Sequence, residues 1–346
     1  MKLINPLILA ISISLFIVTG CSKEDSTANP TTDFPFTTQK VMALVYDQLL
    51  DGKSLKGLDN TPYNPIGFCR AGDTLFIANR AGDSGLIIVR ISTNEVIKKL
   101  TSWEYNGVTE KFDFDVMDVT VNNQFIFVVN RSSRIDVFNR NNYSYVTTIG
   151  KTGWQTSSLL QCESADLVGD KLFIRDKQRI KVVRLEDCTP ENRFKVPIFS
   201  ESKDSTAANN GFAIETVRSF QGNAYVTDFV QSKIFVISAE SVQTKGEKLE
   251  FLRSYTLPYK PIGIDFYEGD AFVTCNNNQI LRMDLKTGEI KERFASFAGN
   301  IPLGITSRIC FVDNNFYLGG VSGSATLTNG TIKQGKVAFM EFSELE

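Results

Sequence analysis

Three acidic residues, Asp118, Asp166 and Glu215, recur at nearly regular intervals and are the first candidates for chemistry. Each stands in a short, largely apolar run typical of an inner strand, so we expect the three at near-equivalent positions in successive units. Converging carboxylates are ligands for a hard cation such as Ca²⁺, and a divalent ion held there could polarise a carbonyl group or a water molecule. The alternative, which we favour, is that they are solvated side chains lining a channel.

The chain contains no histidine, and this absence narrows the possible chemistry. It excludes Ser-His-Asp and Cys-His mechanisms, zinc held by imidazole, and lactonase reactions that need a histidine base. The net charge of −2 over 346 residues gives no reason to expect a nucleic-acid partner. Since no nucleophile motif is present either, the composition favours a binding protein over an enzyme.

Aromatic and basic residues form a second group of candidates. Trp103 and Trp154 are the only tryptophans, and their separation equals that of Asn79 and Asn130. We expect them to form a rim over one face, suited to a sugar ring, a flat ligand or a protein loop. The other predicted rim residues are Tyr63, Arg80, Tyr105, Arg131 and Tyr259. The alternative is that both tryptophans pack between structural units.

The elements that position these residues come from a repeat. Similar stretches recur six times at steps of 45 to 53 residues: GDTLFIAN at 72, NNQFIFVVN at 122, GDKLFIRD at 169, GNAYVTD at 222, GDAFVTCN at 269 and NNFYLGG at 314. The Gly-Asp, Asn-Asn and Gly-Asn pairs are hairpin turns between a first and a second strand, and two further strands follow. We therefore predict an all-β, six-bladed β-propeller of four-stranded antiparallel blades over residues 39–346.

Two further features refine this prediction. Most second strands end in Asn or Asp, and we expect these side chains to bond the backbone of the following turn rather than a metal. The residues are Asn79, Asn130, Asp176, Asp228 and Asn276.

The sixth unit ends after its third strand at 337–342, while a spare strand at 41–46 precedes the first unit. We expect this N-terminal strand to complete the last blade and close the ring.

The stretch VVNRSSRIDVF at 128–138, with NPIGF, KPIGI and IPLGI ahead of other second strands, resembles the NHL-type six-bladed propellers. The resemblance implies binding at the face with the loops between second and third strands. Related gluconolactonase-like propellers hold a central ion with Glu, Asn and Asp, although their motifs are not recognisable here. The expected function is a membrane-anchored, non-catalytic binding protein. A metal-dependent hydrolase or lactonase is the alternative, and a scaffold docked on an envelope complex is a third.

The N-terminus has the pattern of a targeting segment. A basic residue, an apolar run and Val18-Thr19-Gly20-Cys21 resemble the lipobox of bacterial lipoproteins, which implies a signal peptide over 1–20 and acylation, for instance with palmitate, at Cys21. Residues 21–38 form a polar tether whose first residues are similar to the surface-export signal of Bacteroidetes lipoproteins, or are a plain spacer. We expect an outer-membrane lipoprotein whose partner is a small molecule, a glycan or an envelope protein. Pairing of Cys162 with Cys188 stays open.

Overall fold

The structure is a computed structural model that describes part of the chain. The described residues are 40–50, 55–58, 63–80, 85–112, 115–151, 158–177, 179–202, 214–243, 245–246, 249, 251–297, 301–302, 306–312, 315–320 and 337–343. The predicted signal peptide, tether and Cys21 lie outside these ranges, as does Trp154. Within them, no helix has both the length and the apolar character needed to cross a membrane.

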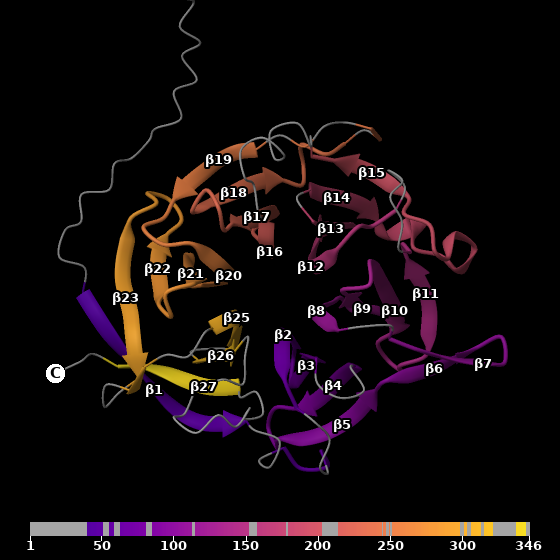
Figure 1. Cartoon of the computed structure of the whole chain (residues 1–346), viewed down its shortest axis with the longest axis horizontal. Coiled ribbons are helices and arrows are strands. Elements are labelled where there is room, and N and C mark those ends of the chain that lie inside the picture. Colours follow the sequence, from indigo (N-terminus) through magenta and orange to yellow (C-terminus); the bar gives the residue numbers. More distant parts are fainter. Residues whose placement is uncertain are drawn as a thin grey trace, which may run out of the picture. The chain divides into compact units, whose positions relative to one another are not determined.

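Four antiparallel sheets of four strands each lie around a ring (Figure 1). Neighbouring strands in each sheet are consecutive in the chain, and tight turns join the first and second strands of each sheet. The first sheet has β2 (Pro65–Ala71), β3 (Thr74–Asn79), β4 (Gly85–Arg90) and β5 (Glu95–Leu100), and the second has β8 (Val116–Val121), β9 (Phe125–Asn130), β10 (Arg134–Asn139) and β11 (Tyr145–Ile149). The third has β12 (Cys162–Val168), β13 (Lys171–Asp176), β14 (Arg179–Arg184) and β15 (Ile198–Glu201), and the fourth has β16 (Ile214–Phe220), β17 (Asn223–Asp228), β18 (Lys233–Ser238) and β19 (Phe251–Thr256).

The remaining strands of the ring form one nine-stranded sheet, so the prediction of six blades was wrong and the ring has five. This sheet combines β20 (Pro261–Tyr267), β21 (Asp270–Cys275), β22 (Ile280–Asp284), β23 (Ile290–Phe297), β24 (Ile301–Pro302), β25 (Thr306–Val312), β26 (Asn315–Gly320), β27 (Val337–Ser343) and β1 (Lys40–Leu50). The N-terminal strand β1 pairs antiparallel with β27, as a closing strand should, but its other edge pairs in parallel with β23. The strands of two sequence repeats are thereby joined, and neither edge of β1 is left unpaired.

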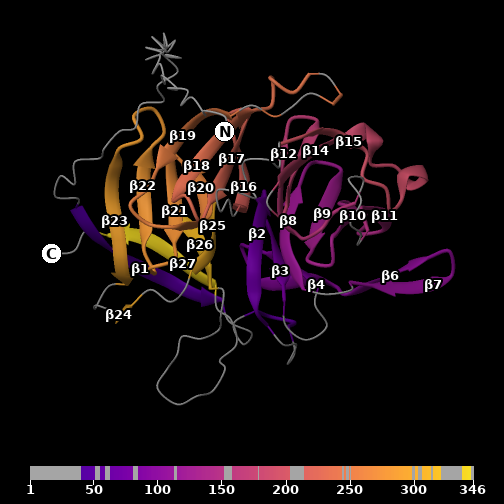
Figure 2. The ribbon, with the colours of Figure 1, turned by 45° about the horizontal axis from the view of Figure 1, so that its top comes forward.

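A two-stranded hairpin, β6 (Ser102–Tyr105) and β7 (Val108–Lys111), is inserted between the first and second sheets. It projects from the ring in both views (Figures 1 and 2). Two short 3-10 helices, η1 (Leu185–Asp187) and η2 (Pro190–Asn192), lie between β14 and β15. The hairpin has no counterpart in the sequence repeat, so the repeat did not predict it.

The middle strands are buried on both faces because each sheet is covered by a sheet on either side. In β3, β9 and β13 every residue after the first is buried. Residues of neighbouring sheets mix in one cluster: Phe76 and Ile88 of the first sheet pack with Val119 and Val128 of the second. This explains why the second strand of each repeat is a nearly continuous apolar run.

The six inner strands, β2, β8, β12, β16, β20 and β25, share one irregularity. Each has a β-bulge after its first residue, where the register of pairing with the next strand shifts by one. Beyond the bulge the register defines two levels. The first inner level comprises Gly67, Asp118, Ser164, Thr216, Gly263 and Arg308, and the second comprises Cys69, Thr120, Asp166, Arg218, Asp265 and Cys310.

Candidate functional site

A polar cavity of about 300 Å³ lies among the inner strands. Its walls contain all six residues of the second inner level and none of the first. On four strands they also include the residue that follows the second-level position, for example Arg70 and Ser219. These positions belong to the strand ends next to the turns between first and second strands. The cavity therefore lies toward the face opposite the one that the family resemblance implied.

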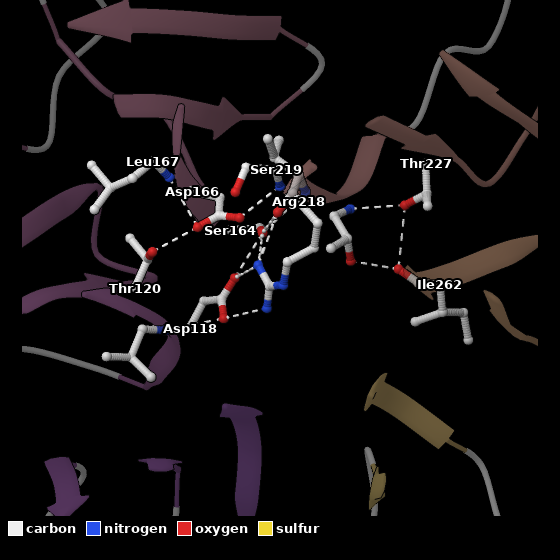
Figure 3. Close-up of polar contacts among 12 residues, drawn as sticks. Asp118, Thr120, Ser164, Asp166, Leu167, Arg218, Ser219, Thr227 and Ile262 are labelled. Carbon is white, nitrogen blue, oxygen red and sulfur yellow. Dashed lines mark hydrogen bonds and ion pairs between the residues drawn. The ribbon is translucent and has the colours of Figure 1, made fainter. Parts of the chain in front are cut away.

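One charged residue in the wall of the cavity is Arg218, which is only 8 % exposed. Figure 3 shows its guanidinium reaching from β16 to Asp118 on β8, two sheets away. The pair is bidentate: Nη1 lies 2.8 Å from Oδ2 and Nη2 lies 2.8 Å from Oδ1. Asp118 is fully buried and also accepts hydrogen bonds from the Ser164 hydroxyl at 2.7 Å and the Val119 amide at 3.0 Å. Burial lowers the pKa of Arg218, but Asp118 outweighs burial and the net shift is upward.

Asp166 and Asp265 are the carboxylates that line the cavity, and Asp166 is held by neutral donors. Its Oδ1 accepts from the Thr120 hydroxyl at 2.6 Å and the Leu167 amide at 2.9 Å, and its Oδ2 accepts from the Ser219 amide at 2.7 Å (Figure 3). Within the described part of the chain no cationic group forms an ion pair with it. Asp166 therefore faces the cavity as an oriented carboxylate with acceptor capacity left on Oδ2.

The structure does not bring Asp118, Asp166 and Glu215 together as one ligand set. Asp118 is on the first inner level, Asp166 is on the second, and Glu215 is the bulge residue of β16. Asp118 already has a guanidinium on both oxygens, which occupies the place a cation would take. The described residues contain no group of three or more Cys, Asp or Glu side chains placed to hold a metal ion. These residues do not fit the Ca²⁺ site that the sequence allowed.

Two cysteines also line the cavity, Cys69 on β2 and Cys310 on β25. Both are free thiols, as are the other three described cysteines, including Cys162 and Cys188. Burial raises the pKa of Cys69 to about 12 and that of Cys310 well above its ordinary value. Both thiols are therefore protonated and weakly nucleophilic at neutral pH.

The predicted rim residues Arg80 and Arg131 meet on the opposite face, which we call the loop face. Arg80 Nε lies 2.7 Å from Asp115, and Arg131 lies 3.8 Å from the same carboxylate. Arg131 Nε also lies 3.2 Å from Glu163, whose other oxygen lies 2.7 Å from Arg175. Three guanidiniums and two carboxylates thus form a chain of ion pairs over three neighbouring sheets. Arg131 is its most accessible member, with a side chain that is 42 % exposed.

The aromatic rim residues have mostly structural surroundings. Trp103 is only 6 % exposed and stacks on Tyr145 with ring centroids 5.4 Å apart. Tyr105 lies beneath the guanidinium of Arg193, 3.9 Å from its ring centroid, and Arg193 also pairs with Glu110. These contacts fix the β6–β7 hairpin against the second sheet. Trp103 therefore offers little surface to a ligand.

The other two predicted rim tyrosines lie apart from this cluster. Tyr63 is buried at 1 % exposure and packs with Leu58 and Phe68 in the core beside the first sheet. Tyr259 is half-buried, and its hydroxyl lies 3.2 Å from Arg293. Of the predicted rim, Arg80 and Arg131 are the residues that the structure joins in one accessible cluster.

The role expected for the strand-end Asn and Asp residues is confirmed at Asn130 and Asp228, whereas Asn79 and Asp176 bond the backbone just ahead of the first strand of their own sheet. Asn79 accepts a hydrogen bond from the Asn64 amide at 2.7 Å, and Asn130 from the Ser132 amide at 3.1 Å. Asp176 accepts from the Gln161 amide, and Asp228 from the Gln231 amide. Asn276 does not end its strand, because β21 ends one residue earlier at Cys275.

Sequence reasoning missed Arg218 and the two cavity thiols, although a signal was present. Every second-level residue pairs with an aromatic residue of the second strand: Phe76, Phe127, Phe173, Tyr225, Phe272 or Tyr317. This aromatic residue recurs in every repeat. Pairing this aromatic residue across the hairpin turn with the first strand of its repeat would have placed Cys69, Asp166 and Arg218 on one level.

These features define the class of protein: the chain is a β-propeller. The chain is similar in structure to U3-55K (TM-score 0.55, 10% identity, 77% of this chain and 76% of that chain). The propeller domain of Myceliophteria thermophila Cps50 (Swd1) matches with TM-score 0.53 and 7% identity over 87% of this chain and 100% of that chain. The WD40 propeller domain of Doa1 matches with TM-score 0.50 and 11% identity over 79% and 77%. No family model and no curated protein sequence matches the chain.

Proposed function

We propose that the chain is a lipid-anchored, non-catalytic binding protein of the bacterial envelope. The lipobox-like residues Val18 to Cys21 and the polar tether support the anchor. The propeller fold supports a binding role, since closed rings of sheets present loops on a rigid frame. The loop face is the proposed contact surface, and its partner is a protein with exposed carboxylates.

The chain of ion pairs on the loop face is the observation that favours this partner. Its three guanidiniums exceed its two carboxylates by one positive charge. Arg131 has the most exposed side chain of the group, at 42 %. Arg is a frequent hot-spot residue, because its planar group binds carboxylates with two hydrogen bonds. An acidic loop of a partner would therefore bind over β8 and β12.

The anchor is tested by metabolic labelling with palmitate and by fractionation of cells that express the full chain. We expect label on the wild-type protein, and both label and membrane association should be lost in Cys21→Ser. Label retained by Cys21→Ser would refute acylation at this cysteine.

The contact surface is tested by photo-crosslinking from a reactive amino acid placed at position 132, next to Arg131. We expect one discrete adduct that disappears in Arg131→Glu and persists in Arg90→Glu, a matched reversal of an exposed Arg in another ion pair. An adduct that both variants keep would show that the loop-face charges do not bind the partner.

A further inference from the structure

The central cavity contains a buried donor that the protein leaves unused. Arg218 is 8 % exposed, and its recorded hydrogen bonds all come from Nη1 and Nη2. Among the described residues none accepts from its Nε–H, and Arg218 lines the cavity, so this donor is available to a ligand. A ligand oxygen there would replace water as the acceptor of a charged donor, and charge-assisted hydrogen bonds are the stronger ones.

An acceptor of the opposite kind is also present in the wall. Asp166 lines the same cavity, and its Oδ2 receives one hydrogen bond, from the Ser219 amide. A carboxylate oxygen has capacity for a second donor. A ligand that both accepts and donates hydrogen bonds would therefore match the cavity wall.

The charges indicate that this ligand is neutral. Asp118 already balances Arg218 through two contacts of 2.8 Å, and Asp166 and Asp265 both line the cavity, so an anionic ligand would add negative charge close to these carboxylates. A cationic ligand would lie beside Arg218 and Arg70, which both line the cavity. Hydroxyl groups avoid both costs because each one donates and accepts.

The size and the remaining walls agree with this chemistry. About 300 Å³ is at the lower end of the usual range for ligand sites, so one small ring fits better than an extended chain. Val121 and Leu167, which are half-buried, supply apolar surface for the C–H face of such a ring. We propose that the central cavity binds a small neutral polyhydroxylated molecule of monosaccharide size.

The cavity thiols provide the assay. Purified full-length protein is treated with methyl methanethiosulfonate at mildly alkaline pH, with and without D-glucose, D-galactose, D-mannose or N-acetyl-D-glucosamine, and each cysteine is followed by peptide mass spectrometry. Cys188 does not line the cavity and is the internal control. At sugar concentrations ten times the Kd, modification of Cys69 should slow about tenfold, because only the free protein reacts, while Cys188 is unaffected.

Two variants locate the binding site. Asp166→Asn keeps the size of the side chain but removes the charge, and it should weaken sugar binding about tenfold in calorimetry. Asp170→Asn changes an Asp in the turn of the same sheet whose side chain is 72 % exposed, and it should bind like the wild type. If none of the four sugars protects Cys69, or if Asp166→Asn binds as tightly as the wild type, the proposal is overturned. Protection by an amine such as putrescine instead would replace it with a cation site.

Discussion

The pair of Arg218 and Asp118 should stabilise the propeller more than any single exposed ion pair. Replacing Arg218 with Met removes two charged hydrogen bonds of 2.8 Å from a carboxylate that is 0 % exposed. Charged hydrogen bonds contribute about 1.5–3 kcal/mol each, which gives about 3–6 kcal/mol and agrees with the ~3–5 kcal/mol cost of breaking a buried pair. The Ser164 hydroxyl and the Val119 amide would still donate to Asp118, but neither is charged.

The assay is urea unfolding followed by circular dichroism for Arg218→Met, Asp118→Asn and the double variant. Because each single change leaves a buried charge without its partner, the double variant should be more stable than the sum of the single effects predicts, by at least about 1 kcal/mol. Arg90→Met is the matched control. Arg90 pairs with Glu95 at 3.0 Å, but both side chains are about half exposed, so its loss should change stability by less than about 0.5 kcal/mol.

The reasoning would be refuted by a cost for Arg218→Met no larger than that of Arg90→Met, or by additivity of the two single effects. Either result would mean that water reaches Asp118 and that the pair is not buried as described. If Arg218→Met does not fold, Arg218→Lys keeps the charge without the bidentate geometry and should show a smaller loss than the Met variant.

Three further predictions concern other parts of the ring. Gly67→Ala should destabilise by more than about 2 kcal/mol in urea unfolding, because its Cβ would lie 2.7 Å from the Asp118 Cα, whereas Gly72→Ala meets no atom within 4 Å and should cost only the ~1–2 kcal/mol of its positive φ. The alkylation rate of Cys69 should keep rising with pH past 9, since its pKa is raised to about 12; a plateau near pH 9 in iodoacetamide kinetics would contradict its burial. Trp103→Ala should cost about 3–5 kcal/mol and release the β6–β7 hairpin to limited proteolysis; unchanged stability would show that its aromatic contacts are not structural.

The repeat predicted the strands well because it arises from local chemistry. Turn residues such as Gly72 and Asp73, followed by an apolar run, depend only on backbone sterics and burial, so they can be recognised in sequence. The number of blades depends instead on which edges pair. The parallel contact of β1 with β23 joins residues about 250 positions apart, such as Lys40 and Glu292, and no local pattern encodes it.

The site was harder to predict for two reasons. Each inner strand has a bulge after its first residue, and the two inner levels are only two residues apart on each strand. Asp118, Asp166 and Glu215 look equivalent when the inner strands are aligned by eye, yet they occupy three different positions once the bulge is counted. The partner of Asp118 is Arg218, which is 100 residues away. Its role appears only when the strands are assembled around the ring.

The two proposed sites use opposite ends of the same inner strands, and this makes them separable. Arg131 and Glu163 lie where β8 and β12 begin, whereas the cavity lies beyond the buried pair of Asp118 and Arg218. Arg131→Glu should therefore abolish the loop-face crosslink and leave sugar protection of Cys69 intact, while Asp166→Asn should do the reverse. Loss of both readouts in either variant, in protein that still unfolds cooperatively, would mean that the ends of the strands are coupled and that the buried pair transmits binding from one face to the other.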